Sequence, residues 1–146
     1  MSSAFDEGAT IPTRHTCDGE DVSPELTWQG APAGTRSFVL IMDDPDAPGR
    51  TFTHWVLFDI PASQTTLPEG FQPGDVGTSG ANDFGKTGYG GPCPPPGHGP
   101  HRYFFTLYAL NTDVLNLPAN ASRPAVEQAM RDHLIAQARL MGRYER

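Results

Sequence analysis

The sequence THWVLFDI, residues 53–60, is a run of apolar and aromatic side chains that stops at Pro61. Two similar runs lie on either side of it, RSFVLIMDD at 36–44 and RYFFTLYAL at 102–110. β-branched and aromatic residues are enriched in strands, and short apolar runs bounded by turn residues are typical of buried strands. The three runs therefore predict three strands.

Turn residues are abundant around these strands. The chain holds 16 glycines and 15 prolines in 146 residues, well above their average share of about 12% together. Pro32 and Gly34 stand where a type I turn places them, which predicts a hairpin between 36–44 and a partner strand over Glu25–Gln29. Dense turns between short strands favour an antiparallel sandwich over alternating βαβ units.

One helix is predicted near the C-terminal end. Ser122 suits the N-cap, and Pro124 is tolerated in a first turn. The apolar residues that follow share one helical face: Val126, Met130 and Leu134. We predict that the helix ends near Ile135 and that the alternating pattern over 137–144 is a strand. The competing interpretation continues the helix to Gly142 as its C-terminal cap.

Length and charge narrow the class of protein. A chain of 146 residues fits a single domain over 1–146. The net charge of −7 repels a phosphate backbone, so nucleic acid is not an expected partner. The N-terminus MSSAFDEGAT lacks the pattern of a signal peptide, and no apolar stretch reaches membrane-spanning length. These features predict a cytoplasmic protein without stable membrane insertion.

The two cysteines, Cys17 and Cys93, do not form a CxxC motif, so zinc binding has little support. In a cytoplasmic protein we expect both thiols to be reduced. A bridge between Cys17 and Cys93 is the alternative, since both lie in predicted loops near one site.

Three segments carry polar groups suited to chemistry. In DPDAP (44–48) the prolines stiffen the chain around Asp44 and Asp46, whose carboxylates can orient a histidine or accept from a ligand; the alternative is a turn with solvated carboxylates. His54 faces away from its neighbour Trp55 on the strand and can bind an anion or serve as a structural hydrogen-bond partner.

The third segment is GYGGPCPPPGHGPHRY, residues 88–103. Its glycines allow backbone N–H groups to approach an anion closely, and its prolines make it rigid. His98 and His101 follow, and Tyr103 begins the next strand. A long surface loop is the alternative, although long loops in compact domains are usually functional or disordered. The GxSxG, HExxH and P-loop signatures are absent, so no enzyme, cofactor or resident metal is predicted.

Several of these motifs together resemble the phosphatidylethanolamine-binding protein family, in its bacterial and archaeal branch. The similar segments occur in family order: CDGEDVSPELTW (17–28), DPDAP (44–48), THWVLFDIP (53–61), NDFGKTGYGGPCPPPG (82–97) and HRYFFTLYAL (101–110). The resemblance implies a Greek-key antiparallel β-sandwich with a C-terminal helix and one small pocket for phosphate-like anions. By motif match, the ligand-binding positions of the family fall on Asp44, Asp46, Pro48, His54, Gly90, Gly91, Pro92, His101 and Tyr103.

The resemblance also suggests roles. Gly90, Gly91 and Pro92 match a loop that offers backbone N–H groups, and Asp46 matches a loop-fixing residue. His98 lies in a stretch that differs from animal members, so no role is assigned to it. A homodimer is expected by analogy with prokaryotic relatives.

The preferred hypothesis is a regulatory module that binds a small anion or a phosphorylated, phosphoethanolamine-like ligand. Charged imidazoles of His54 and His101, the Tyr103 hydroxyl and loop N–H groups would hold the anion, with affinity rising as pH falls through about 6.5. The alternative is a protein inhibitor of a serine protease or a kinase. A third hypothesis is an enzyme whose metal is held by His54, His101, Asp44 and Asp46.

Overall fold

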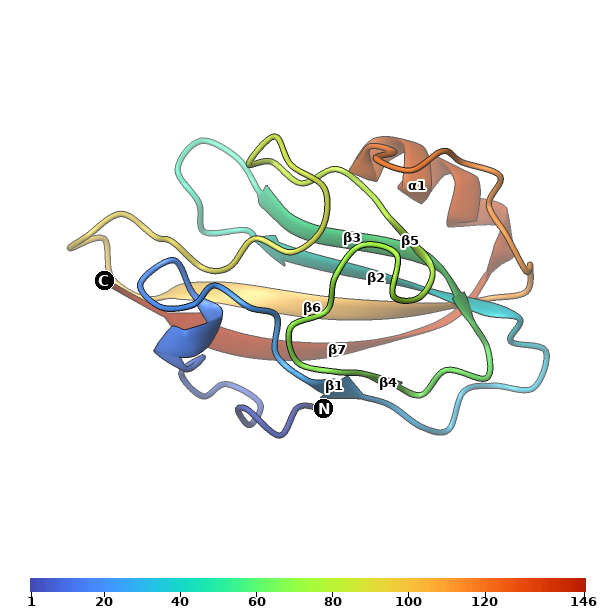
Figure 1. Cartoon of the computed structure of the whole chain (residues 1–146), viewed down its shortest axis with the longest axis horizontal. Coiled ribbons are helices and arrows are strands. Elements are labelled where there is room, and N and C mark those ends of the chain that lie inside the picture. Colours follow the sequence, from blue (N-terminus) through green and yellow to red (C-terminus); the bar gives the residue numbers. More distant parts are fainter.

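The computed structural model describes all 146 residues and shows a mainly β protein with two antiparallel sheets (Figure 1). The larger sheet has the strand order β5-β3-β2-β6-β7, and β1 pairs with β4 in a two-stranded sheet. The strands are β1 (Leu26–Thr27), β2 (Ser37–Asp44), β3 (Phe52–Pro61), β4 (Thr66–Leu67), β5 (Thr78–Ser79), β6 (His101–Leu110) and β7 (Leu134–Tyr144). Helix α1 covers Arg123–Met130, and short 3-10 helices cover Thr13–His15 and Arg131–His133. The three strands predicted from their apolar runs are confirmed as β2, β3 and β6.

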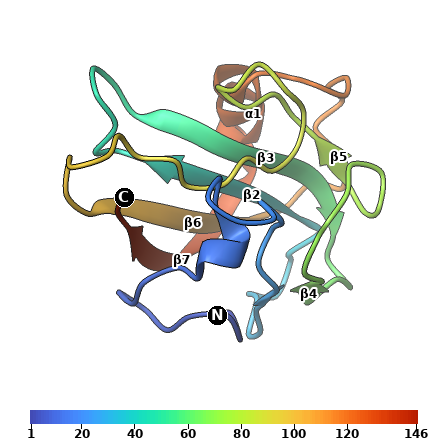
Figure 2. The ribbon, with the colours of Figure 1, turned by 60° about the vertical axis from the view of Figure 1, so that its left-hand side comes forward.

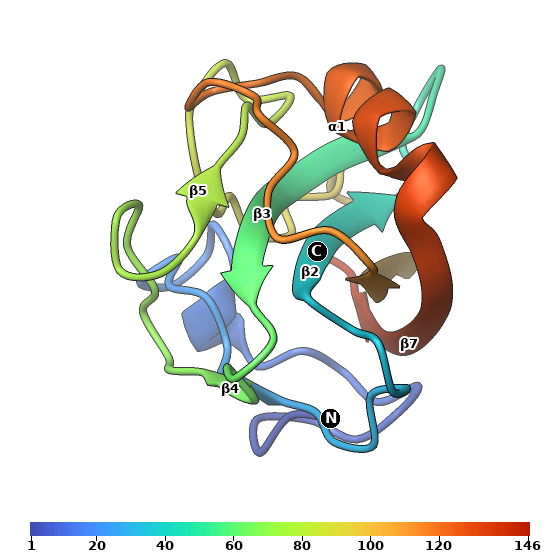
Figure 3. The ribbon, with the colours of Figure 1, turned by 90° about the vertical axis from the view of Figure 1, so that its right-hand side faces the viewer.

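The larger sheet is covered on both faces, as Figures 2 and 3 show. Helix α1 packs on one face, where Val39 and Ile41 of β2 join Val126 of the helix in one apolar cluster. The N-terminal segment and the small sheet cover the other face. Strand side chains alternate between faces, and both faces of β2 are covered. Its central residues, Phe38 to Met42, therefore form a continuous buried apolar run.

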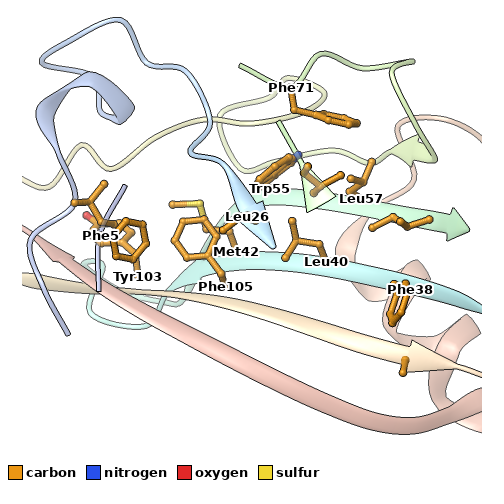
Figure 4. Close-up of a cluster of buried hydrophobic side chains, with 14 of the residues drawn as sticks. Phe5, Leu26, Phe38, Leu40, Met42, Trp55, Leu57, Phe71, Tyr103 and Phe105 are labelled. Carbon is orange, nitrogen blue, oxygen red and sulfur yellow. The ribbon is translucent and has the colours of Figure 1, made fainter. Parts of the chain in front are cut away.

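The larger apolar cluster fills the space between the main sheet and the N-terminal layer (Figure 4). Phe38, Leu40 and Met42 of β2 contribute to it, as do Trp55 of β3 and Tyr103 of β6. Its fully buried members fix the positions of the central strands. The strand ends that carry polar residues are therefore held on a rigid frame.

The predicted hairpin between Glu25–Gln29 and β2 is wrong. Leu26 and Thr27 pair with Leu67 and Thr66 of β4 instead. A strand has only two edges, and those of β2 are taken by β3 and β6. The turn at Pro32 and Gly34 therefore leads from one sheet to the other.

The C-terminal region contains the predicted helix and strand, but their boundaries differ from the prediction. The Ser122 hydroxyl caps α1 by accepting from the Ala125 N–H at 3.3 Å. The helix ends at Met130, and the strand begins at Leu134, which we predicted on the helical face. Leu134 instead pairs with Leu110 of β6. Strand formation is favoured from Leu134 onward because pairing satisfies backbone groups of β6 along an edge that would otherwise be open. The alternative prediction, a helix that continues to Gly142, is also wrong.

Cys17 and Cys93 form a disulfide bond across a sequence separation of 76 residues. The expectation of two reduced thiols is thus wrong, and the alternative bridge is present. The Cys17 N–H donates to the Pro92 carbonyl at 3.1 Å, and the two Cα atoms lie 5.4 Å apart, within the usual range for a disulfide. The bond ties the N-terminal layer to the proline-rich loop before β6.

Two loops meet at one end of the main sheet, on the left of Figure 1. One connects β2 to β3 (45–51), and the other is the proline-rich loop before β6, which runs beside the C-terminus. The residues predicted to bind a ligand are concentrated at this end.

Candidate functional site

Asp44 and His101 form the buried centre of the site. Asp44 ends β2 and His101 begins β6, and because these neighbouring strands are antiparallel, the two ends lie side by side. The Asp44 Oδ2 atom lies 2.6 Å from the His101 Nδ1 atom, and both side chains are almost fully buried. The carboxylate accepts, so His101 carries a proton on Nδ1 and turns Nε2 away from Asp44. Orienting a histidine is one of the two roles predicted for Asp44.

His54 is buried beside this pair and behaves differently. Its Nδ1 atom lies 2.7 Å from the Gly90 carbonyl oxygen, which can only accept, so Nδ1 carries the proton. Burial lowers the pKa of His54, and the Gly90 hydrogen bond and the Asp44 charge oppose this effect without cancelling it. The lowered pKa favours a neutral His54 near pH 7, with Nε2 free to accept a hydrogen bond.

Tyr103 lies next to both imidazoles. Its ring centroid is 5.3 Å from that of His54 and 6.4 Å from that of His101. Burial and the nearby Asp44 carboxylate raise the pKa of the Tyr103 hydroxyl above its ordinary value. The hydroxyl therefore stays protonated and can donate a hydrogen bond.

These groups line one cavity with a volume of about 200 Å³. Five of the predicted residues lie on its wall: Asp44, Pro48, His54, His101 and Tyr103. The residues that sequence reasoning missed there are Ala47, Phe52, Phe84, Cys93, Pro94 and Pro95. The cavity thus combines a polar floor with apolar walls, as small-molecule sites usually do.

Two of the missed residues, Phe52 and Phe84, form an aromatic wall. Their rings are 4.8 Å apart, and each also packs against His54. Phe52 precedes His54 by two positions on β3, so the strand period could have placed it on the same face. Phe84 belongs to a loop, and no local pattern indicates that it would reach the cavity.

The predicted anion nest at Gly90 and Gly91 is wrong. The Gly90 N–H donates to the His54 carbonyl at 3.0 Å, and the Gly91 N–H donates to Asp21 Oδ1 at 2.9 Å. Neither glycine, nor Pro92, lines the cavity. Packing explains why small residues stand here: a Cβ on Gly91 would lie 2.2 Å from the His15 carbonyl oxygen.

Asp46 fixes the loop after β2, the role that the resemblance suggested. Its Oδ2 atom accepts from the backbone N–H and from Nε of Arg102, each at 2.9 Å, and Oδ1 accepts from Nη2 at 2.8 Å. These hydrogen bonds from Arg102 lower the pKa of Asp46 to about 2. Asp46 does not line the cavity, and its carboxylate is occupied by Arg102.

His98, to which no role was assigned, contacts the buried pair. Its Nδ1 atom lies 2.6 Å from the Nε2 atom of His101. Asp44, His101 and His98 thus form a continuous hydrogen-bonded chain from the buried sheet end to the loop surface. No three His, Cys, Asp or Glu side chains are arranged to hold a metal ion, so the geometry gives no support to the metal-site hypothesis.

Nearly the whole chain matches a known protein family. The family model described as phosphatidylethanolamine-binding protein matches residues 1–145. The chain belongs to this family. Members similar to it include a UPF0098 protein of Aquifex aeolicus, 54% identical over all of this chain and 87% of that protein. A UPF0098 protein of Methanothermobacter thermautotrophicus is 49% identical over 98% of this chain and 95% of its own length.

Solved structures of the phosphatidylethanolamine-binding protein family show the same fold. The homologue CT736 of Chlamydia trachomatis matches with a TM-score of 0.92 and 36% identity, over 100% of this chain and 95% of that one. YbcL of E. coli also matches with a TM-score of 0.92, at 37% identity over 100% of this chain and 96% of that one. The predicted mainly β fold with a helix near the C-terminal end is thereby confirmed.

Proposed function

We propose that this family member binds a small anion, a phosphate group or a phosphate head group, in the cavity at the end of the sheet, and that binding has a regulatory rather than a catalytic role. The observation that carries the proposal is the convergence of His54, His101 and Tyr103 on one cavity of about 200 Å³. These residues come from two strands, and the sheet alone brings them together.

The groups offer a defined set of hydrogen bonds. The Tyr103 hydroxyl donates to a phosphate oxygen, while neutral His54 accepts at Nε2 from a protonated oxygen of the ligand. A singly protonated phosphate presents both kinds of oxygen. Both oxygens of the Asp44 carboxylate are held by the protein, because Oδ2 is engaged by His101 at 2.6 Å and Oδ1 accepts from the Asp46 N–H at 2.8 Å.

The positive charge for the anion comes from the His98–His101 pair. The two nitrogens that face each other at 2.6 Å share one proton, and a second proton makes the pair cationic. The charged groups that face it are Asp44, which hydrogen-bonds His101, and the residues of an adjoining hollow, Asp46, Arg102 and Arg143. Because protonation of a histidine adds positive charge, we expect anion affinity to rise as the pH falls from 8 to 5.5.

Calorimetry with inorganic phosphate and with phosphoethanolamine tests the proposal. The variant Tyr103→Phe removes one donor and should weaken binding about five-fold, the value of one hydrogen bond near 1 kcal/mol. Tyr108→Phe is the matched control, because Tyr108 lies on the same strand but packs against the α1 cluster. Equal affinity at both pH values, together with no effect of Tyr103→Phe, would contradict the proposal.

Inhibition of a serine protease or a kinase is the alternative function. A solved structure of carboxypeptidase Y inhibitor with its cognate proteinase matches at 24% identity and a TM-score of 0.53, a similarity that establishes a shared fold. The observation that favours the alternative is the exposed, rigid Pro95-Pro96 segment at the cavity rim. Inhibition assays on carboxypeptidase Y and a panel of serine proteases and kinases separate the two functions.

The compartment is a separate proposal. The structure contains no helix with the length and apolarity to cross a bilayer. The expected cytoplasmic location is not confirmed, and the Cys17–Cys93 bond favours an oxidising environment. A relative from Mycobacterium tuberculosis, 42% identical over 99% of this chain, is named as a candidate lipoprotein, LppC. We propose an oxidising compartment, and alkylation of the cysteines in freshly lysed cells, which would find both thiols free in the cytoplasm, tests it.

A further inference from the structure

A second, polar hollow adjoins the cavity. It has a volume of about 380 Å³ and is lined by Asp46, His98, Pro100, His101, Arg102 and Arg143. His101 lines both the cavity and this hollow. Arg102 and Arg143, which line the hollow, belong to the start of β6 and the end of β7. These strand ends lie beside the C-terminus in Figure 1.

Two arginines face each other across the strands at this place. Arg102 of β6 is the direct partner of Arg143 of β7 in the sheet register. Residues opposite each other in an antiparallel pair point to the same face, and like charges there destabilise the pairing. Placing two guanidinium groups at such a position is unfavourable unless negative charge balances both of them.

The protein supplies only part of that balance. Asp46 is the one carboxylate that lines the hollow, and both of its oxygens bind Arg102. Arg143 is exposed, and its guanidinium makes no ion pair or hydrogen bond with any side chain. The hollow therefore carries an unbalanced positive charge in a chain whose net charge is −7.

His98 adds a further donor at the same wall. It contacts His101 through Nδ1 at 2.6 Å and lines the hollow but not the cavity. Arginine is well suited to bind a phosphate or carboxylate through two parallel hydrogen bonds. An anionic group in the hollow would face Arg143 and His98 without competing with Asp46.

We propose that this hollow is a second anion-binding subsite and that the ligand class carries two anionic groups, one held in the cavity and one held by Arg143 and His98. The inference rests on the proposed function for the first group only. It names the ligand more narrowly than a single phosphate: a polyphosphate or a phosphate ester with a second acidic group.

Calorimetry with three probes tests the subsite: inorganic phosphate, pyrophosphate and tripolyphosphate, the last two spanning different lengths. At least one of the longer probes should bind the wild-type protein about ten-fold more tightly than phosphate, as expected for an added charge-assisted contact. Arg143→Gln should abolish this gain. Arg143→Lys should retain most of the gain.

Arg139→Gln is the matched control, because Arg139 lies on the same strand and is exposed but stacks on the Phe104 ring, 4.5 Å from its centroid, outside the hollow. If Arg143→Gln and Arg139→Gln lowered the affinity for the longer probes equally, net charge alone would explain the effect and the proposed subsite would be wrong. It would also be wrong if the longer probes bound the wild-type protein no better than phosphate. If the longer probes depend on Arg143 while phosphate binding is indifferent to Tyr103→Phe, the subsite stands and the proposed function of the cavity fails.

Discussion

The Asp44 carboxylate lies 2.6 Å from the imidazole of His101, although the two residues are 57 positions apart in the chain. Both are nearly fully buried, and a buried charge is tolerated only where hydrogen bonds compensate it. The pairing of β2 with β6 therefore decides the state of the site: it fixes the His101 ring and leaves Nε2 directed toward His98.

The variant Asp44→Asn tests this relationship. A neutral amide keeps the shape but no longer balances the positive charge that the imidazole gains on protonation. We expect the free energy of unfolding to fall by about 2 kcal/mol, as for a hydrogen bond to a charged group, and phosphate affinity at pH 5.5 to fall about ten-fold. Asp43→Asn, which disturbs the Arg123 ion pair next to it, is the control and should leave phosphate binding unchanged.

The lowered pKa of His54 predicts a stability that depends on pH. The unfolded chain takes up a proton near pH 6.5, whereas folded His54 does so only at lower pH. The unfolded state thus binds more protons between these values, so stability is complete above about pH 6.5 and is lost as the pH falls below it. Urea denaturation from pH 8 to 5 should show a smaller decline in His54→Gln than in the wild type. His133→Gln is the control, because His133 is hydrogen-bonded to Asn111. An equal decline in the free energy of unfolding of both variants would argue against a neutral, buried His54.

Removal of the disulfide should destabilise the protein strongly. The bond closes a loop with a sequence separation of 76 residues, for which chain entropy in the unfolded state predicts about 4 kcal/mol. We expect Cys17→Ser/Cys93→Ser to unfold at a much lower urea concentration than the wild type. A reducing agent should shift the wild-type midpoint toward that of the variant, and an unchanged midpoint would show that the bond contributes little.

The glycines beside the cavity should differ in their tolerance of a methyl group. A Cβ on Gly91 meets the His15 carbonyl oxygen, part of the backbone, whereas a Cβ on Gly90 meets the Phe84 ring at 2.4 Å. Phe84 is 42% exposed and can rotate away. Overpacking lowers stability by about 1–3 kcal/mol. We expect the stability loss of Gly91→Ala to lie near the upper end of this range and that of Gly90→Ala near the lower end. Gly90→Ala should also change phosphate affinity because it displaces Phe84 from the cavity wall, and a larger stability loss for Gly90→Ala than for Gly91→Ala would contradict this packing.

Sequence reasoning was most successful where a pattern is local. The apolar runs at 36–44, 53–60 and 102–110 define strands because most side chains buried in a sheet are apolar, wherever they stand in the chain. The Ser122 cap was predictable for the same reason, since its partner lies three residues away. The end of α1 was not, because the edge of β6 competes for the residues from Leu134 onward.

Several features of the site depended on distant partners instead. The sequence alone suggested that Gly90 and Gly91 offer their N–H groups to an anion, yet those groups bind His54 and Asp21. The contact of Phe84 with the cavity and the join of Cys17 to Cys93 likewise involve residues that no local pattern links.

The sequence by itself determined the family and the mainly β architecture, because burial and turn chemistry act within a few positions of each residue. Only the tertiary structure decided which of the predicted site residues share a cavity, which imidazole nitrogen carries a proton, and that Arg143 stands unpaired opposite Arg102. Proton positions and unbalanced charge depend on atoms that approach through space, and strand pairing sets those approaches.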